Sequence, residues 1–211
     1  MKIIKMEAKK FSDNILSMKG ISKKTVEEHL KLYQGYVNKY NEIQEKLSLL
    51  KDNDYEKANQ VYSNIRELKT ELSFAWGGVV NHEIYFSHLG GKGRVPSGTL
   101  LKQIDEDFGS FENYKKDLKA TAISARGWVW TGWNQMEERL VNYLGDSQNT
   151  YAMWGVVPLV ALDVYEHAYF ADFGVKRADY IDAFFENLDW NVIEENFQDL
   201  VGCCGENCQC E

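Results

Sequence analysis

The stretch Leu162-Asp163-Val164-Tyr165-Glu166-His167-Ala168-Tyr169 is the most informative part of this chain. Asp163 ends the apolar run 156–162, which is typical of a buried strand. A free carboxylate at the end of such a strand is costly unless it is ligated or hydrogen-bonded. His167 follows four residues later, so a carboxylate and an imidazole can reach one metal ion. The spacing alone is weak evidence, because it also occurs by chance on solvated helices.

The chain has 4 histidines, and two others strengthen this interpretation. His29 and His82 lie in segments whose helical periodicity can present them inward. Three imidazoles and one carboxylate suit a first-row transition ion, and redox-active iron or manganese is favoured. The remaining histidine, His88, is interpreted as an ordinary core or surface residue, which is the commoner role of a single histidine on an apolar helix face.

The first half of the chain predicts a helical hairpin. Apolar and aromatic residues recur at helical spacing over 21–50, and Ser22 is a plausible N-cap. A charged break follows at 51–54. A second helical stretch then runs to about Leu89, with an interruption expected at Gly77-Gly78.

The second half mixes helices with a small sheet. The glycine-rich segment 90–98 is the clearest linker. Beyond it the patterns predict helices over 97–107 and 111–124, strands over 127–131, 139–144 and 156–162, and helical structure over 178–200. This order indicates the α+β class. We expect an N-terminal helical-hairpin domain over 1–90, a C-terminal domain over 91–202 and a cysteine-rich tail over 203–211.

Composition narrows the function classes. The formal net charge of -8 argues against non-specific nucleic-acid binding. No apolar run reaches the length of a signal peptide or a membrane span, so we expect no membrane association and a cytoplasmic protein.

All 4 cysteines lie in the last nine residues, which excludes a disulfide framework through the fold. They could hold zinc, copper(I) or an iron–sulfur centre, although their spacing is not a usual zinc pattern. The alternative is a tail that only carries reactive thiols. The thiols in question are Cys203, Cys204, Cys208 and Cys210.

Several stretches together resemble the iron/manganese superoxide dismutase family, in the right order and over nearly the whole chain up to about Leu200. The signature stretch is close to the family's Asp-Val-Trp-Glu-His-Ala-Tyr. The other matching stretches are 21–29, 36–41, Asn81-His82, Phe108-Gly109-Ser110-Phe111 and Gly127-Trp128-Val129-Trp130.

The resemblance implies an activity, a site and a fold. Superoxide would be converted to dioxygen and hydrogen peroxide at one iron or manganese ion per chain, with a solvent molecule as its fifth ligand. The implied fold joins a helical-hairpin lobe to a lobe with a three-stranded antiparallel sheet, assembled as a homodimer or a dimer of dimers. The implied protein ligands are His29, His82, Asp163 and His167.

The resemblance also implies roles around the metal. Gln148 stands near the position that hydrogen-bonds the solvent ligand, although it could also be a surface loop residue. With Gly78, where iron-type members carry glutamine, it slightly favours manganese. Tyr36 corresponds to a residue lining the substrate channel, and Trp128 to an aromatic wall of the site.

Two further positions concern the surroundings of the site. Glu166 corresponds to a residue that reaches the partner subunit's ligand histidine in the dimer. Arg177 corresponds to an arginine near the channel mouth, where a positive charge would attract superoxide.

Four features near the site depart from the family pattern. His29 and Tyr36 are seven residues apart, one fewer than usual, so we predict a regular first helix without a π-bulge. The usual intervening histidine is absent, and Leu32 or Tyr33 is expected to fill its space. Phe170 replaces the tyrosine that this histidine bonds across the dimer.

The signature tryptophan is Tyr165 here, which would change the packing beside the metal and could add a hydrogen bond. These departures leave two alternatives open. The chain could be a non-catalytic structural or interaction protein on the same fold, or a metalloenzyme that acts on another small oxidant.

Overall fold

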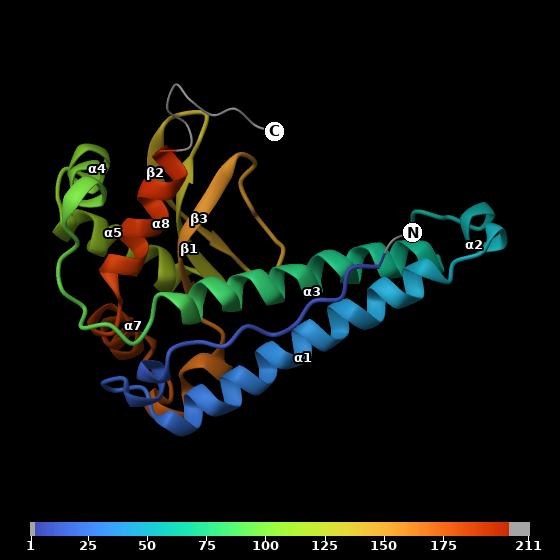
Figure 1. Cartoon of the computed structure of the whole chain (residues 1–211), viewed down its shortest axis with the longest axis horizontal. Coiled ribbons are helices and arrows are strands. Elements are labelled where there is room, and N and C mark those ends of the chain that lie inside the picture. Colours follow the sequence, from blue (N-terminus) through green and yellow to red (C-terminus); the bar gives the residue numbers. More distant parts are fainter. Residues whose placement is uncertain (1–2, 203–211) are drawn as a thin grey trace.

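Two long antiparallel helices form one side of the molecule in a computed structural model, which describes residues 3–202 (Figure 1). They are α1 (Lys23–Ser48) and α3 (Asn64–Ser87), and the short helix α2 (Asp52–Glu56) lies at the far end of the hairpin. A 3-10 turn, η1 (Asp13–Ser17), precedes them. The predicted hairpin is therefore confirmed.

Helix α1 begins where its sequence predicts. The Ser22 hydroxyl accepts a hydrogen bond from the Thr25 backbone N–H at 3.2 Å, which satisfies a donor of the first turn. Val26, His29 and Tyr33 are buried at helical spacing on the face toward α3. The helix is α-helical throughout, as the seven-residue spacing predicts.

The hairpin differs from expectation in two places. The charged break contains α2, because the Asp54 carboxylate accepts from the Lys51 backbone N–H at 2.9 Å and caps the turn. The second helix begins only at Asn64, where the Ser63 hydroxyl caps it. It also continues through Gly77-Gly78, so the expected interruption there was wrong.

The remaining helices and strands follow the predicted order, with longer strands and two extra short helices. The long C-terminal helical stretch is divided between Glu186 and Trp190. In chain order the elements are α4 (Gly98–Phe108), α5 (Phe111–Ser124), β1 (Trp128–Asn134), β2 (Arg139–Gly145), β3 (Val156–Asp163), η2 (Glu166–Ala168), α6 (Phe170–Phe173), α7 (Arg177–Glu186) and α8 (Trp190–Gly202).

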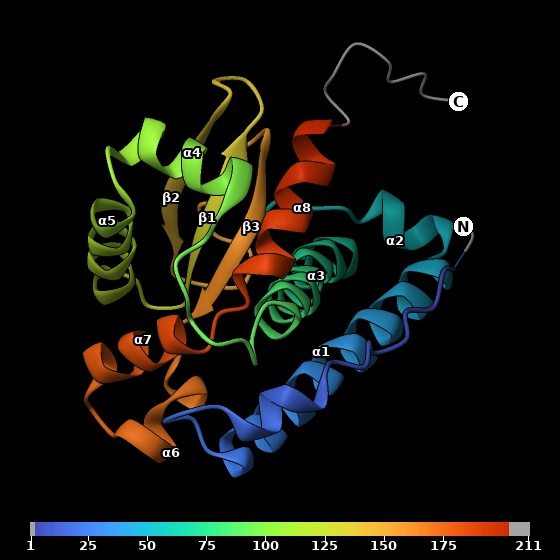
Figure 2. The ribbon, with the colours of Figure 1, turned by 60° about the vertical axis from the view of Figure 1, so that its left-hand side comes forward.

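The three strands form an antiparallel sheet in the order β2-β1-β3, which confirms the α+β class. Helices α4 and α5 lie on one side of the sheet, where α8 packs against α4 and β3, and α3 packs against the other face (Figure 2). Trp128 is paired with Asp163 at one end of the sheet. Asp163 also contacts His29 of α1, so this end of β3 meets the α1–α3 hairpin.

The apolar core is divided unequally. One large cluster joins the sheet, the C-terminal helices and the inner half of the hairpin. A small second cluster fills the outer half of the hairpin, with Ile43, Leu47, Leu68 and Ala75. Within 3–202, the helices all fall short of the length or hydropathy that a membrane crossing requires.

Candidate metal centre

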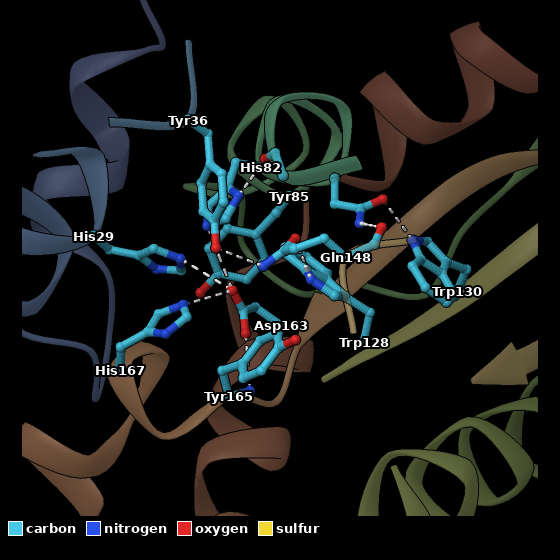
Figure 3. A network of polar contacts seen from close by, with 12 residues as sticks. His29, Tyr36, His82, Tyr85, Trp128, Trp130, Gln148, Asp163, Tyr165 and His167 are labelled. Carbon is cyan, nitrogen blue, oxygen red and sulfur yellow. Dashed lines mark hydrogen bonds and ion pairs between the residues drawn. The ribbon is translucent and has the colours of Figure 1, made fainter. Parts of the chain in front are cut away.

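Four segments far apart in the sequence bring three histidines and one aspartate together (Figure 3). His29 comes from α1, His82 from α3, Asp163 from the end of β3 and His167 from η2. Their ligand atoms all lie within 4.8 Å of one another. The first three are buried, while the His167 side chain is 30% exposed.

Asp163 is the centre of the cluster. Its Oδ2 lies 3.1 Å from Nε2 of both His29 and His167, and 3.6 Å from Nε2 of His82. Its Oδ1 accepts from the Tyr165 backbone N–H at 2.9 Å. The Tyr180 hydroxyl donates to its backbone carbonyl at 2.8 Å. The carboxylate is thus held with one oxygen toward the three imidazoles.

The orientation of His82 shows that the site fits a metal ion. Its Nδ1 lies 2.5 Å from the Gly78 carbonyl, one turn earlier in α3, so Nδ1 carries the proton and donates. Nε2 then carries the lone pair, and it is buried without a hydrogen-bond partner within 3–202. A buried nitrogen that faces a carboxylate and two more imidazoles is a suitable ligand for iron or manganese.

Burial and the carboxylate determine the protonation of the cluster. Burial alone would raise the pKa of Asp163, but hydrogen bonds from His167 and His29 outweigh it and hold the pKa well below its usual range. Burial lowers the pKa of His82 to about 3, and it also lowers the pKa of His29. The cluster therefore offers an ionised carboxylate and two neutral imidazoles near neutral pH.

Gln148 links two aromatic residues beside the cluster. Its Oε1 accepts from Trp128 Nε1 at 2.9 Å, and its Nε2 donates to the Tyr36 hydroxyl oxygen at 3.1 Å. Gln148 is 3% exposed, so the surface-loop alternative is wrong. Figure 3 shows Tyr36 and Gln148 pointing toward the four ligand candidates.

The glycine pair in α3 makes this contact possible. A Cβ on Gly77 would lie 2.1 Å from the Gln148 carbonyl oxygen, and one on Gly78 would lie 2.4 Å from the Tyr36 ring. Because neither glycine has a side chain, the β2–β3 loop and Tyr36 can pack directly against α3. The helix itself continues through both glycines.

The structure places the other implied residues at the edge of the site. Glu166 and Phe170 are exposed, the latter by 51%. Arg177 donates to the Ala125 carbonyl at 2.7 Å and to the Tyr169 hydroxyl at 3.2 Å. The Tyr165 ring stacks on His167 with centroids 5.3 Å apart.

The structure shows what occupies the space of the missing helix histidine and what His88 contacts. Tyr33, with 2% of its surface exposed, fills the space beside the hairpin, whereas Leu32 is half-buried. His88 lies outside the cluster, as expected, and its Nε2 accepts from the Ala161 backbone N–H at 3.0 Å. His88 thus ties α3 to β3, the two elements that carry His82 and Asp163.

Sequence reasoning missed three residues that support the site. Asn81 donates to the Gln148 carbonyl at 3.1 Å and accepts from Trp130 Nε1 at 3.2 Å. Tyr180 bonds the Asp163 carbonyl, and Tyr85 lies 3.2 Å from the Tyr180 hydroxyl. Asn81 belongs to the matching Asn81-His82 stretch but was given no role, and the two tyrosines resemble ordinary core residues. The four tail cysteines lie outside the described residues.

Comparison with known families places both halves of the chain. Residues 18–90 match the alpha-hairpin domain of iron/manganese superoxide dismutases, and residues 96–196 match the C-terminal domain of the same enzymes.

Individual relatives agree with the family match. The chain is 48% identical over 185 residues to proteins named superoxide dismutase [Fe] from Aquifex aeolicus and Aquifex pyrophilus, covering 86% of this chain and 86% of each relative. It is 35% identical to a mitochondrial superoxide dismutase [Mn] from Glossina morsitans morsitans, covering 86% of this chain and 83% of that protein. This chain belongs to the iron/manganese superoxide dismutase family.

Proposed function

We infer that this protein is a superoxide dismutase that uses iron or manganese. The observation that carries the inference is the convergence of three imidazoles and one ionised carboxylate in a member of this family. We propose His29, His82, Asp163 and His167 as the four protein ligands. When bound, the ion supplies one-electron redox chemistry, by which two superoxide anions and two protons become dioxygen and hydrogen peroxide.

Tyr36, Gln148 and Trp128 are proposed to manage protons beside the ion. Because the Gln148 amide donates to the Tyr36 oxygen, the hydroxyl proton of Tyr36 remains free to donate toward the substrate side. Burial raises the pKa of Tyr36, so this proton is retained until it is needed. Trp128 anchors the other end of the Gln148 amide and fixes its orientation.

Arg177 is proposed to favour entry of the anionic substrate into an acidic protein. Its bonds to the Ala125 carbonyl and the Tyr169 hydroxyl hold the guanidinium in place without neutralising its charge. An Arg177→Gln variant should show a lower second-order rate with superoxide and a weaker salt dependence of that rate.

Metal analysis together with a superoxide assay tests the proposal. We expect about one iron or manganese per chain, and pulse radiolysis should show catalytic superoxide decay. His167→Ala should lower both metal content and activity. Far less than one ion per chain, or unchanged activity in this variant, would contradict the assignment. A metal-loaded protein that is active only toward another oxidant would favour the alternative metalloenzyme.

We propose manganese as the slightly better metal. Support comes from Gln148, which approaches from the β2–β3 loop, and from Gly78, which leaves no side chain at the competing position on α3. The two Aquifex relatives carry iron in their names, so iron is the competing metal for this chain. Activity per bound ion, measured after reconstitution with each metal, decides it.

A homodimer, or a dimer of such dimers, is proposed for the assembly. The exposed Glu166 and Phe170 flank the partly exposed His167, so one surface carries a charged group, an apolar ring and a proposed ligand. Sedimentation of the wild type and of Glu166→Ala tests this. We expect a dimer that dissociates more readily in the variant; a monomeric wild type contradicts the proposal.

A second metal on the cysteine tail is proposed separately. Four thiols at Cys203, Cys204, Cys208 and Cys210 could bind a soft ion such as zinc or copper(I). A variant with all four changed to serine should lose that ion and keep the iron or manganese. Equal zinc and copper content in both proteins would contradict it.

A further inference from the structure

A partly buried carboxylate lies next to His82 on α3 and takes no part in the cluster. The Glu83 side chain is 12% exposed. It accepts a hydrogen bond from the Tyr33 hydroxyl at 2.9 Å and pairs with Lys9 Nζ at 2.6 Å. A buried carboxylate requires such partners, because desolvation of an isolated charge is expensive.

Lys9 belongs to an N-terminal strap, residues 5–11, that runs along the α1–α3 hairpin (Figures 1 and 2). The Lys9 backbone N–H donates to the Tyr33 oxygen at 2.9 Å. Further along the strap, Met6 exchanges two hydrogen bonds with the Asn41 side chain, each 2.9 Å long. These bonds hold the Lys9 backbone beside Tyr33.

Tyr33 connects this ion pair to the candidate metal centre. It lies four residues after His29, one turn along the same face of α1. Its ring stacks on the His82 ring with centroids 6.3 Å apart and an interplanar angle of 28°. The path from Glu83 to His82 runs through the packed Tyr33 ring, where a charge acts over a longer distance than it does in water. One aromatic ring therefore separates the Glu83–Lys9 pair from the His82 ring.

We propose that the Glu83–Lys9 ion pair sets the redox potential of the bound metal, with Glu83 favouring the oxidised ion and Lys9 opposing it. The proposal rests on the proposed function, since it requires iron or manganese on His82. Neither residue touches the ion, so both act through the field around it. In the wild type the opposite charges of Glu83 and Lys9 largely cancel. Loss of either charge leaves a net charge near His82.

Two amide variants test this with opposite predicted signs. Glu83→Gln removes a negative charge and should raise the midpoint potential in a redox titration followed by the optical spectrum. Lys9→Gln removes a positive charge and should lower it. Both amides can still hydrogen-bond to the remaining partner. A merely structural role would move both potentials in the same direction, and the double variant should return near the wild-type value.

The other ion pair of the strap is a matched control. Lys5 pairs with Glu45 at 2.9 Å, but Glu45 lies sixteen residues beyond His29, about 24 Å along α1. Lys5→Gln and Glu45→Gln make the same charge changes and should leave the potential unchanged. Shifts as large as those at Lys9 and Glu83 would overturn the proposal.

The outcomes separate this proposal from the function on which it rests. A wild-type protein without iron or manganese refutes the function, whereas full metal content with unshifted potentials refutes only the tuning. Lys9 is 65% exposed, so Lys9→Gln is expected to fold even if Glu83→Gln does not. If Lys9→Gln raises the midpoint potential or leaves it unchanged, the proposal is overturned.

Discussion

The inner and outer ends of the α1–α3 hairpin belong to the same two helices but are stabilised differently. At the inner end, buried polar groups bond across the chain, such as Gln148 to Tyr36 and His29 to Asp163. At the outer end, a small apolar cluster is surrounded by exposed pairs within one helix, such as Glu42 with Lys39 and Lys46. Polar contacts from the hairpin to the end of β3 and to Gln148 therefore mark the part of the hairpin that carries chemistry.

Asp163→Ala should give the largest effect at the inner end. It removes the oxygen on which all three histidines converge, so we expect activity to fall by more than the roughly 10–100-fold that loss of an outer partner causes. Metal analysis and pulse radiolysis measure this. Asp52→Ala at the outer end is the control, and equal losses in both variants would contradict the comparison.

Acidification should weaken the inner end through His88. Burial lowers its pKa to about 3 from an ordinary 6.5, so between these values the unfolded state binds the proton and the folded state does not. The contribution of His88 to the free energy of unfolding is fully present above about pH 6.5 and is lost as the pH drops toward 3. The loss is at most about 1.4 kcal/mol for each unit by which the pKa is lowered.

Denaturant unfolding at several pH values checks this against His88→Gln, which can still accept from Ala161 but cannot take up a proton. Below about pH 6.5, the free energy of unfolding of the variant should fall less steeply with decreasing pH than that of the wild type. Identical slopes in the two proteins would show that His88 contributes nothing to the pH dependence.

Leu47→Ala should weaken the outer end without changing the chemistry. Leu47 is 5% exposed in the small cluster, and truncation of a buried leucine costs about 2–5 kcal/mol. Denaturant unfolding should show this loss while metal content and activity per bound ion stay constant. A fall in activity per ion would mean that the two ends are coupled.

Gln148→Leu should lower activity by about 10–100-fold while the metal stays bound. Trp128 Nε1 loses its acceptor and Tyr36 loses its donor, so the proton supply is disturbed. Asn149→Ala, a change at the next and exposed position of the loop, should have little effect. Loss of metal from the Gln148 variant would instead give Gln148 a structural role.

Glu42→Gln should have the smallest effect. Hydrogen bonds from Lys39 and Lys46 lower the pKa of this exposed carboxyl to about 2, but water and salt screen such pairs. Thermal unfolding above pH 5 should be unchanged. A clear loss of stability would show that the outer end depends on its surface charges.

Much of the fold could be predicted from local patterns. Ser22 and the helical spacing of apolar residues located the first helix, and aromatic and β-branched residues or a continuous apolar run located the three strands. The errors came at the charged break, which contains α2 and delays α3 to Asn64, at Gly77-Gly78, and at the break between α7 and α8. At the glycine pair, contacts with Gln148 and Tyr36 override the low helix propensity of glycine, and such contacts are invisible in a local window.

The candidate ligands were also identified from the sequence, because their chemical types and their agreement with a family pattern are local facts. The supporting contacts were not. Tyr180 reaches the Asp163 carbonyl, and Glu83 reaches Lys9, across stretches of chain that no periodicity connects. The role of such residues depends on which neighbour the fold supplies.

The sequence by itself determined the helices and strands, the family and the four residues that can bind a metal, because these depend on residue type and spacing. Only the tertiary structure decided that Asp163 Oδ2 faces the imidazoles, that Gln148 joins Tyr36 to Trp128, and that a charge pair lies behind His82. The physical reason is that hydrogen bonds and charges act over a few ångströms in space, whatever the separation along the chain.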